Sequence, residues 1–304
     1  MSLRRLFAAV MGWVVAAGGV LPFGSGAETI TFTIDQTLSA ASLSGTVMGL
    51  TMQAQGAGSL TTHYAGTIKA EVAGSTLRLT GGSLISALNN GSWAPAVGGG
   101  SGSAPANYGT LVSALFLGSG RAAVRDLLVD LTSDVIGVTN GLFRSPGLRF
   151  TYSTNPPTAF DYNHNILGGG QGRSFLSGVL TNAASGNASL IAQAGQLILS
   201  IPVDVTGNGS AFSANDLVYR LQGVLVAAAP VLAPISILSL TLAPAQLGVT
   251  ITTTSGRAYS VLGYTNLAGP AMVLDQFTAT NSTTARTISR SSTAARQYLR
   301  VRLD

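Results

Sequence analysis

The chain has 304 residues, of which 46% are hydrophobic and only 9% are charged, and it contains 38 glycines and no cysteine. This composition excludes an intrinsically disordered chain, and the missing cysteines exclude both disulfides and thiol catalysis. The formal net charge is +5 at pH 7. Abundant glycine with few charges is typical of short strands joined by tight turns, so we predict an all-β protein.

The first residues have the pattern of a secretory signal. Arg4 and Arg5 precede an apolar run over 6–20, and small residues follow at the positions that a signal peptidase reads. The run is shorter than the roughly 20 residues needed to cross a bilayer. We therefore expect residues 1–27 to be removed. The product is expected to be secreted and extracellular, with the periplasm and the cell surface as alternatives, and without an integral membrane span.

Alternation of apolar and polar residues predicts several half-buried strands. In the first of them, Ile30, Phe32 and Ile34 share one face, while three threonines share the other. Pro202 has no N–H to donate to a ladder, so we expect its strand at a sheet edge or a bulge. Short strands separated by glycine, serine and asparagine are typical of an antiparallel β-sandwich or a barrel. Further strands are expected at 76–80, 148–153, 196–205 and 217–227.

Two secondary structures, a helix and a strand, are possible for the segment 121–135. Its charged side chains recur at the i,i+4 spacing of a helix. They are Arg121, Arg125, Asp126, Asp130 and Asp134. The end of the segment and the VIGVTNG that overlaps and follows it are poor helix formers. We therefore expect a strand, with a helix as the alternative.

Composition divides the chain in two. The stretch GGGSGSAPANYG, residues 98–109, is expected to form an irregular loop with Trp93 at its rim. Further on, two prolines interrupt the strand pattern in AAAPVLAPIS, residues 227–236. We predict a sandwich or barrel-like domain at 28–228, a linker at 229–235 and a small second domain at 236–304.

The stretch DVTGNGSAFSANDL, residues 204–217, carries the oxygen-bearing side chains of a calcium loop in its first half. An EF-hand loop also needs a bidentate acid at its twelfth position and a helix on each side. The twelfth residue is Asn215, and Asp216 comes one position late. Because alternating strands flank the stretch, we expect a β-hairpin whose connection contains Gly207, Asn208 and Gly209.

A second polar stretch is FDYNHNILGGG, residues 160–170. Asp161, Asn163 and Asn165 fall on one strand face, where they suggest a cation site. No glycine follows at the turn position and no second carboxylate is near in sequence. We expect a polar strand face instead, and we predict neither a metal nor a cofactor.

Motifs for catalysis are scarce. The chain has no Gly-x-Ser-x-Gly and no His-Glu-x-x-His, and its two histidines are His63 and His164. A glycosidase needs two facing carboxyls, for which Asp126, Asp130 and Asp134 are candidates, although solvated surface charge is their default interpretation. Phosphate loops and the basic–aromatic interleaving of nucleic-acid binders are absent. We predict no enzymatic activity and no nucleic-acid partner, with a hydrolase of unknown type as a third possibility.

The last quarter of the chain resembles a small immunoglobulin-like or fibronectin-type-III-like module found at the ends of secreted proteins of environmental bacteria. The matching residues are Gly256, Arg257, Tyr259, Thr265, Asn266, Leu267, Arg296, Tyr298, Arg300 and Val301. Ala271 and Met272 stand where that family has a tryptophan. The resemblance implies a β-sandwich that serves for display or docking.

The longer part resembles exosortase-sorted exported proteins of bacteria that produce extracellular polysaccharide. The matching phrases are SLTTHYAGTI at 59–68, GGSLISA at 81–87, RDLLVDLTS at 125–133, IPVDV at 201–205 and NDLVYRLQG at 215–223. We find no sorting tail of that family in the sequence, which favours release or a different attachment. The resemblance implies an extracellular place and no particular activity.

These observations predict a secreted, non-catalytic protein of the extracellular matrix or cell surface with an adhesive or structural role. The alternative is a carbohydrate-binding protein that acts on extracellular polysaccharide, with Trp93 and Tyr108 as stacking surfaces. The basic end of the chain suggests a further site. If 284–290 and 296–303 pair as a hairpin, one ribbon would present four arginines to an anionic glycan. They are Arg286, Arg290, Arg300 and Arg302.

Overall fold

The computed structural model describes residues 27–231, 235–243, 245–264, 270–289 and 298–303. By their contacts the residues group into unit 1, Met1–Pro230, and unit 2, Val231–Asp304. This division falls inside the segment expected as a linker. The expected signal segment lies outside the described residues, apart from Ala27.

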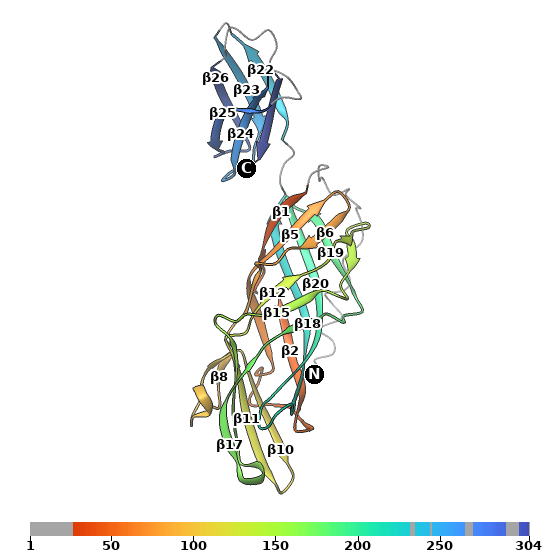
Figure 1. Ribbon diagram of the computed structural model, residues 1–304, viewed down its shortest axis with the longest axis vertical. Coiled ribbons are helices and arrows are strands. Elements are labelled where there is room, and N and C mark those ends of the chain that lie inside the picture. The colour runs from red at the N-terminus through yellow and green to blue at the C-terminus, as the bar shows by residue number, and fades with distance from the viewer. Residues whose placement is uncertain (1–26, 232–234, 244, 265–269, 290–297, 304) are drawn as a thin grey trace. The chain divides into compact units, whose positions relative to one another are not determined.

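The all-β prediction is confirmed (Figure 1). The regular elements of the described residues are strands, apart from two single turns of 3-10 helix, η2 (Val97–Gly99) and η3 (Ile166–Gly168). Across the same residues, no helix has the length and hydrophobicity that crossing a bilayer requires.

The larger sheet of unit 1 contains 14 strands. Its main path runs through β14 (Leu142–Arg144), β19 (Asn187–Gln193), β20 (Gln196–Gly209), β21 (Leu217–Pro230), β1 (Glu28–Ile34), β5 (Thr61–Ala73), β7 (Leu84–Ala87), β12 (Leu128–Thr132), β15 (Arg149–Tyr152) and β18 (Val179–Thr181). Four strands pair beside this path: β2 (Ala40–Val47), β3 (Leu50–Thr51), β6 (Thr76–Leu79) and β13 (Ile136–Gly137).

This sheet rolls back on itself. Just after β18, Asn182 bridges Val205 of β20, and the N–H of Ala183 donates to the carbonyl of Asp204 at 2.8 Å. Inward-facing side chains such as Ile85 are fully buried inside the roll. The alternation of apolar and polar residues therefore predicted correctly which strand faces are buried. The partial closure of the sheet is barrel-like.

The second sheet of unit 1 positions the candidate site. Its antiparallel order is β17 (Gly170–Leu176), β16 (Thr158–His164), β11 (Gly118–Arg125), β10 (Tyr108–Ala114) and β4 (Gln53–Ala54). One face lies on the core through Tyr108, Val124 and Phe160, all buried. Residues of a small hairpin, β8 (Gly91–Trp93) with β9 (Ala104–Ala106), contact the other face together with the loop between them.

The strand prediction for 121–135 is confirmed. β11 ends at Arg125 and β12 begins at Leu128, while Asp126 turns the chain with a φ of 55°. Arg121 and Arg125 therefore belong to β11 and Asp130 belongs to β12, while Asp126 and Asp134 lie outside the strands. Tertiary pairing on both sides of each strand outweighs the weak helical spacing.

The structure corrects one part of the prediction for Pro202, which placed its strand at a sheet edge or a bulge. β20 is an interior strand, between β19 and β21, rather than an edge strand. Its ladder with β19 ends at Ser200, and beyond that point the side chain of Asn182 donates to the Pro202 carbonyl at 2.9 Å. The N–H of Asp204, two residues on, points to the same side and donates to Asn182 Oδ1 at 2.8 Å. Pro202 thus lies where no neighbouring strand requires its missing N–H.

Unit 2 is a sandwich of two three-stranded sheets. One has the order β22 (Ile237–Leu242), β23 (Gln246–Thr252) and β26 (Thr283–Ser289), and the other has the order β25 (Met272–Thr278), β24 (Ala258–Tyr264) and β27 (Tyr298–Leu303). Val249, Ile251 and Ile288 of the first sheet meet Val261 of the second in the core between them. The immunoglobulin-like character of this unit stays a prediction.

The hairpin expected between 284–290 and 296–303 is wrong. β26 pairs with β23, whereas β27 pairs with β24 in the opposite sheet. Alternation identified both strands and their outward faces, but it carries no information about which strand pairs with which.

Candidate functional site

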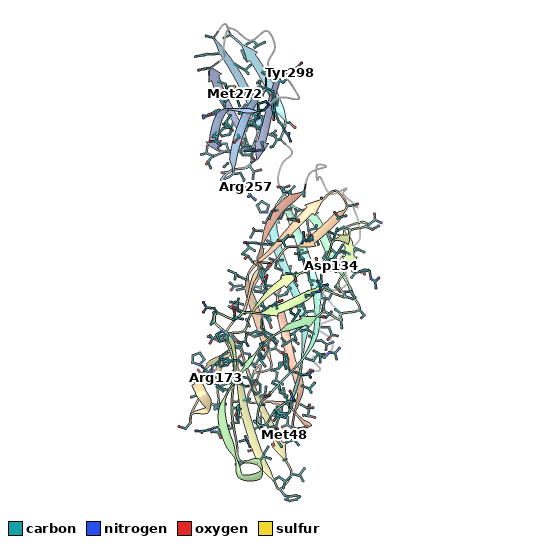
Figure 2. The ribbon with its side chains drawn as sticks, in the orientation of Figure 1. Met48, Asp134, Arg173, Arg257, Met272 and Tyr298 are labelled. Atoms are coloured by element: carbon teal, nitrogen blue, oxygen red, sulfur yellow. The ribbon has the colours of Figure 1, made fainter. Side chains whose placement is uncertain are left out.

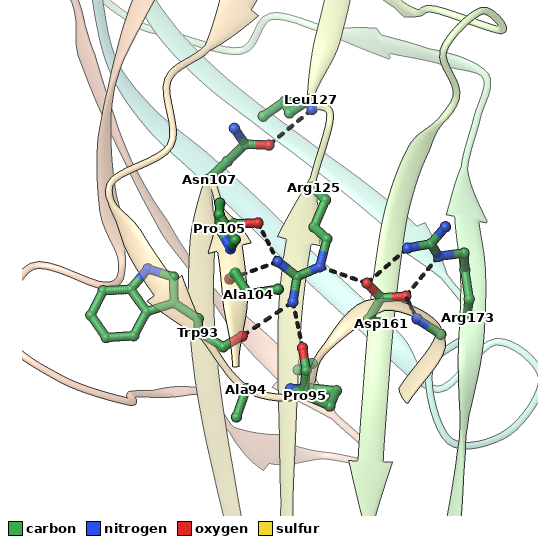
Figure 3. Close-up of polar contacts among 12 residues, drawn as sticks. Trp93, Ala94, Pro95, Ala104, Pro105, Asn107, Arg125, Leu127, Asp161 and Arg173 are labelled. Atoms are coloured by element: carbon green, nitrogen blue, oxygen red, sulfur yellow. Dashed lines mark hydrogen bonds and ion pairs between the residues drawn. The ribbon is translucent and has the colours of Figure 1, made fainter. Parts of the chain in front are cut away.

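Arg125 of β11 holds the loop that covers one face of the five-stranded sheet (Figure 3). The residue is 4% exposed, and its Nε donates to Asp161 Oδ2 at 2.7 Å. The remaining four hydrogen bonds go to the backbone carbonyls of Trp93, Pro95, Ala104 and Pro105. All five donors of the guanidinium are therefore used, and both ends of the loop 94–103 are fastened to the sheet.

Asp161 of β16 joins Arg125 to a second arginine. Its buried carboxylate accepts from Arg173 Nε at 2.7 Å, from Arg173 Nη2 at 3.1 Å and from the N–H of Gly98 at 2.9 Å. Burial by itself raises the pKa of Asp161, but the hydrogen bonds from Arg173, Gly98 and Arg125 outweigh it and hold the pKa below its ordinary value. The same contact with Asp161 raises the pKa of Arg173. The carboxylate is therefore ionised between two cations.

This arrangement corrects the polar strand face expected at 160–170. Asp161 is buried and fully engaged, whereas Asn163 is half-buried and Asn165 is exposed. Asn165 Oδ1 accepts from the N–H of Ser119 at 2.7 Å, so this side chain has a structural partner. Among the residues that the structure describes, no three His, Asp or Glu side chains gather as a metal site would need.

A groove lies between the fastened loop and strands β11 and β16, and we call it the loop groove. It has a volume of about 520 Å³ and is lined by Ala94, Pro95, Gly100, Ser101, Gly102, Ser103, Ser119, Gly120, Arg121, Asn163, His164 and Asn165. The lining contains hydroxyl, amide and guanidinium groups and no carboxylate. These groups can donate hydrogen bonds to an anionic, hydroxyl-rich ligand.

Arg121 and Asn163 are cross-strand neighbours in the loop groove. Arg121 is exposed, and no ion pair or side-chain hydrogen bond within the described residues occupies its guanidinium. Asn163 Nδ2 donates to the Gly99 carbonyl at 3.1 Å and to Gln171 Oε1 at 3.3 Å, so its amide is held by the loop and by β17. An oriented amide and an available guanidinium thus lie side by side.

Trp93 and Tyr108 do not form the stacking pair that the sequence suggested. Tyr108 is fully buried, its hydroxyl lies 2.8 Å from that of Tyr64, and burial raises its pKa well above the ordinary value. Trp93 is half-buried, with its ring against Gly91 and Gly109. Of the two, only Trp93 is partly exposed.

The hairpin predicted at 204–217 is present, but its connection is misplaced: Gly207, Asn208 and Gly209, which were expected in the connection, are paired residues of β20, and residues 210–216 connect the strands. β20 and β21 pair continuously from Gln196 opposite Pro230 to Gly209 opposite Leu217. Asp216 accepts three backbone N–H groups of the turn at 2.6, 2.9 and 2.8 Å, which explains the acid at that position. Asp204 forms a bidentate pair with Arg220, both bonds being 2.6 Å, and this pair lowers the pKa of Asp204.

The histidines and aspartates that were considered for catalysis make structural contacts or lie exposed. The imidazole of His164 stacks on Phe212, with ring centroids 4.1 Å apart, and His63 is exposed on β5. Asp130 accepts backbone N–H groups of Gly82 and Ser83 at 2.9 and 2.8 Å. Asp134 forms an exposed ion pair with Arg149 at 3.2 Å (Figure 2), and Asp126 lies in the turn before β12.

The four arginines of the basic end do not share one ribbon. Arg286 lies on β26 and forms a bidentate pair with Asp275 of the other sheet at 2.6 and 3.0 Å, with its guanidinium 4.9 Å from the Phe277 ring centre. Arg300 and Arg302 face outward on β27. Arg290 lies outside the described residues. The arrangement predicted from the hairpin is therefore wrong, and glycan binding by Arg300 and Arg302 stays a prediction.

Sequence reasoning missed the loop groove because its parts are far apart in the chain. Arg121 and Arg125 appeared only as members of a charge pattern, and Asp161 appeared only as a candidate cation ligand. One signal for the site was available in the sequence. Arg121, Ala123 and Arg125 are two residues apart from one another, which places both arginines on the same face of a strand. In comparisons with known proteins, no family model, no curated protein and no solved structure matches this chain.

Proposed function

We propose that this chain is a secreted, non-catalytic adhesion or matrix protein that binds an acidic extracellular polysaccharide in the loop groove. The observation that carries the proposal is the exposed guanidinium of Arg121 beside the oriented amide of Asn163. Arginine offers a planar fork that matches a carboxylate, such as that of a uronic acid. Asparagine and serine exchange hydrogen bonds with sugar hydroxyls.

Two further features support binding rather than catalysis. Arg125 and Asp161 hold the covering loop against the sheet, so little ordering of the loop opposes binding. The lining of the groove contains no pair of carboxyls of the kind that glycoside hydrolysis uses. An open, polar groove on a rigid strand floor suits the recognition of a polymer by a few sugar units.

Affinity electrophoresis tests this proposal. The native protein is run through gels containing polygalacturonate or neutral dextran, at low and at high salt. We expect retardation by the acidic polymer alone, weakened by salt because exposed charges are screened over about 10 Å at 0.1 M. Arg121→Gln is expected to lose most of this retardation. Arg144→Gln, which removes an exposed arginine of β14, is the matched control and should migrate like the native protein.

Two results would count against the proposal: equal retardation by dextran, or full retardation of the Arg121→Gln protein. The first would mean that no acidic group is recognised, and the second would mean that another surface binds it. The secreted location has its own measurement. Intact mass of the exported protein should correspond to a chain that begins at Glu28, and a product that still carries Met1 would contradict export by signal cleavage.

A further inference from the structure

The edge strand of unit 2 exposes the face that a sandwich normally buries. Leu240 pairs opposite Val249 and Leu242 pairs opposite Leu247, so these leucines share the inward face of the sheet with buried neighbours on β23. Leu240 is nevertheless 51% exposed and Leu242 is 70% exposed. β22 therefore extends beyond the cover that the described part of the opposite sheet provides.

The backbone of β22 is also open on one side. Ala243 and Gln246 exchange two hydrogen bonds, at 2.9 and 3.3 Å. In an antiparallel ladder such pairs alternate with pairs whose N–H and C=O groups point outward. The backbone groups of Leu242 and Leu240 consequently point away from β23, and no other strand in the described residues pairs with them. This edge offers two regularly spaced donors and two acceptors.

The regular part of this edge, residues 239–243, has neither a charge nor a proline, and Pro234 and Pro244 lie outside it. Natural sheets guard free edges with charged side chains, prolines or bulges. Between Arg220 and Arg257 the sequence has no charged residue, and the segment 235–243 reads ISILSLTLA without a proline. A register shift occurs at its start, between Ile237 and Ser239, and leaves the later residues regular. An apolar, uncharged strand with free backbone groups accepts another strand readily.

We propose that β22 pairs with β22 of a second copy of this chain, antiparallel, with Leu240 opposite Leu242 of the second copy. In this register Thr241 lies on the two-fold axis, and each leucine exchanges both backbone hydrogen bonds with its partner. The two three-stranded sheets become one of six strands. Four leucines come together on the inward face, and the absence of charge means that no repulsion opposes the approach.

A second copy fits this edge because the same short pattern satisfies both sides. A two-fold contact requires a surface that is complementary to itself, and Leu240-Thr241-Leu242 reads the same in both directions. This register pairs the outward backbone groups of both leucines with those of leucines in the second copy. Such a contact also joins two binding units, which raises avidity for a polymer. The pairing itself is independent of the loop groove.

Sedimentation velocity of the full-length protein over a concentration series tests the pairing. The native protein should dimerise as its concentration rises. Leu242→Pro removes an N–H that makes no bond to β23, so the fold should persist while dimerisation weakens about tenfold or more. Leu240→Lys should act likewise through charge repulsion. Met272→Lys changes an equally exposed apolar residue of β25 (Figure 2), and this control should dimerise like the native protein.

Cross-linking tests the register, because the chain has no cysteine of its own. Thr241→Cys places two thiols opposite each other at the axis, where Cβ atoms of such pairs lie about 4.5–5.5 Å apart, so mild oxidation should give a disulfide dimer. Ser239→Cys, on the same face but off the axis, should not. A native protein that stays monomeric, a dimer that survives Leu242→Pro, or equal cross-linking of both cysteine variants would each overturn the proposal.

Discussion

Arg125 and Asp161 form a buried ion pair, 2.7 Å long, that connects two neighbouring strands to the loop above them. The side chain of Arg125 is only 5% exposed, and the side chain of Asp161 is fully buried. Removing one member of a buried pair leaves the other charge without compensation, which is costly. The pair therefore couples the shape of the loop groove to the stability of unit 1.

The first prediction concerns Arg125→Met. This change removes five hydrogen bonds and leaves Asp161 with one fewer cation, so the free energy of unfolding should fall by about 3–5 kcal/mol. Urea denaturation at neutral pH measures it. Arg149→Met is the matched control, because it breaks an exposed pair with Asp134 and should cost about 1 kcal/mol or less. Similar losses for the two variants would mean that Arg125 has no special structural role.

The second prediction is a dependence of stability on pH. The pKa of Asp161 is lower in the folded protein than its ordinary value of about 3.9. A lowered folded pKa gives stability that is complete above the unfolded value and disappears as the pH falls through the folded value. The difference in unfolding free energy between native and Asp161→Asn proteins should therefore shrink below about pH 4. Denaturation curves from pH 7 downward measure it, and a constant difference would contradict the ionised pair.

The third prediction concerns the glycine beneath Trp93. A Cβ added at Gly109 would lie 2.4 Å from Trp93 Cγ, so Gly109→Ala should displace the indole and lower the melting temperature. In a protein prepared from residues 28–304, Trp93 is the one tryptophan, and its fluorescence reports the displacement. Gly137→Ala meets no atom within 4 Å and serves as control. Unchanged emission in the Gly109→Ala protein would show that Trp93 is not seated on this glycine.

The fourth prediction concerns calcium and the hairpin of β20 and β21. Both oxygens of the Asp204 carboxylate are bound by Arg220, so calcium should gain no ligand there. A ligand that binds only the folded protein raises its melting temperature by mass action. Melting curves with millimolar calcium and with a chelator should coincide. A calcium-dependent shift that vanishes in Asp204→Asn would restore the metal site.

The sequence by itself determined the class of fold and the faces of many strands. Ile30, Phe32 and Ile34 alternate with polar residues, and burial of every second side chain in a strand follows directly from backbone geometry. The pairing of the two strands that flank 204–217 was predictable as well, because they are neighbours in the chain, although the residues of the connection were not.

Only the tertiary structure decided which strands pair and which charges meet. Arg286 was predicted to share a ribbon with Arg300, but it pairs with Asp275 across the sandwich. Alternation determines which face of a strand is apolar, and it is silent about the neighbouring strand. Asp161 was expected on a polar strand face for the same reason. Its two arginines come from the strands on either side, and a buried charge needs such partners.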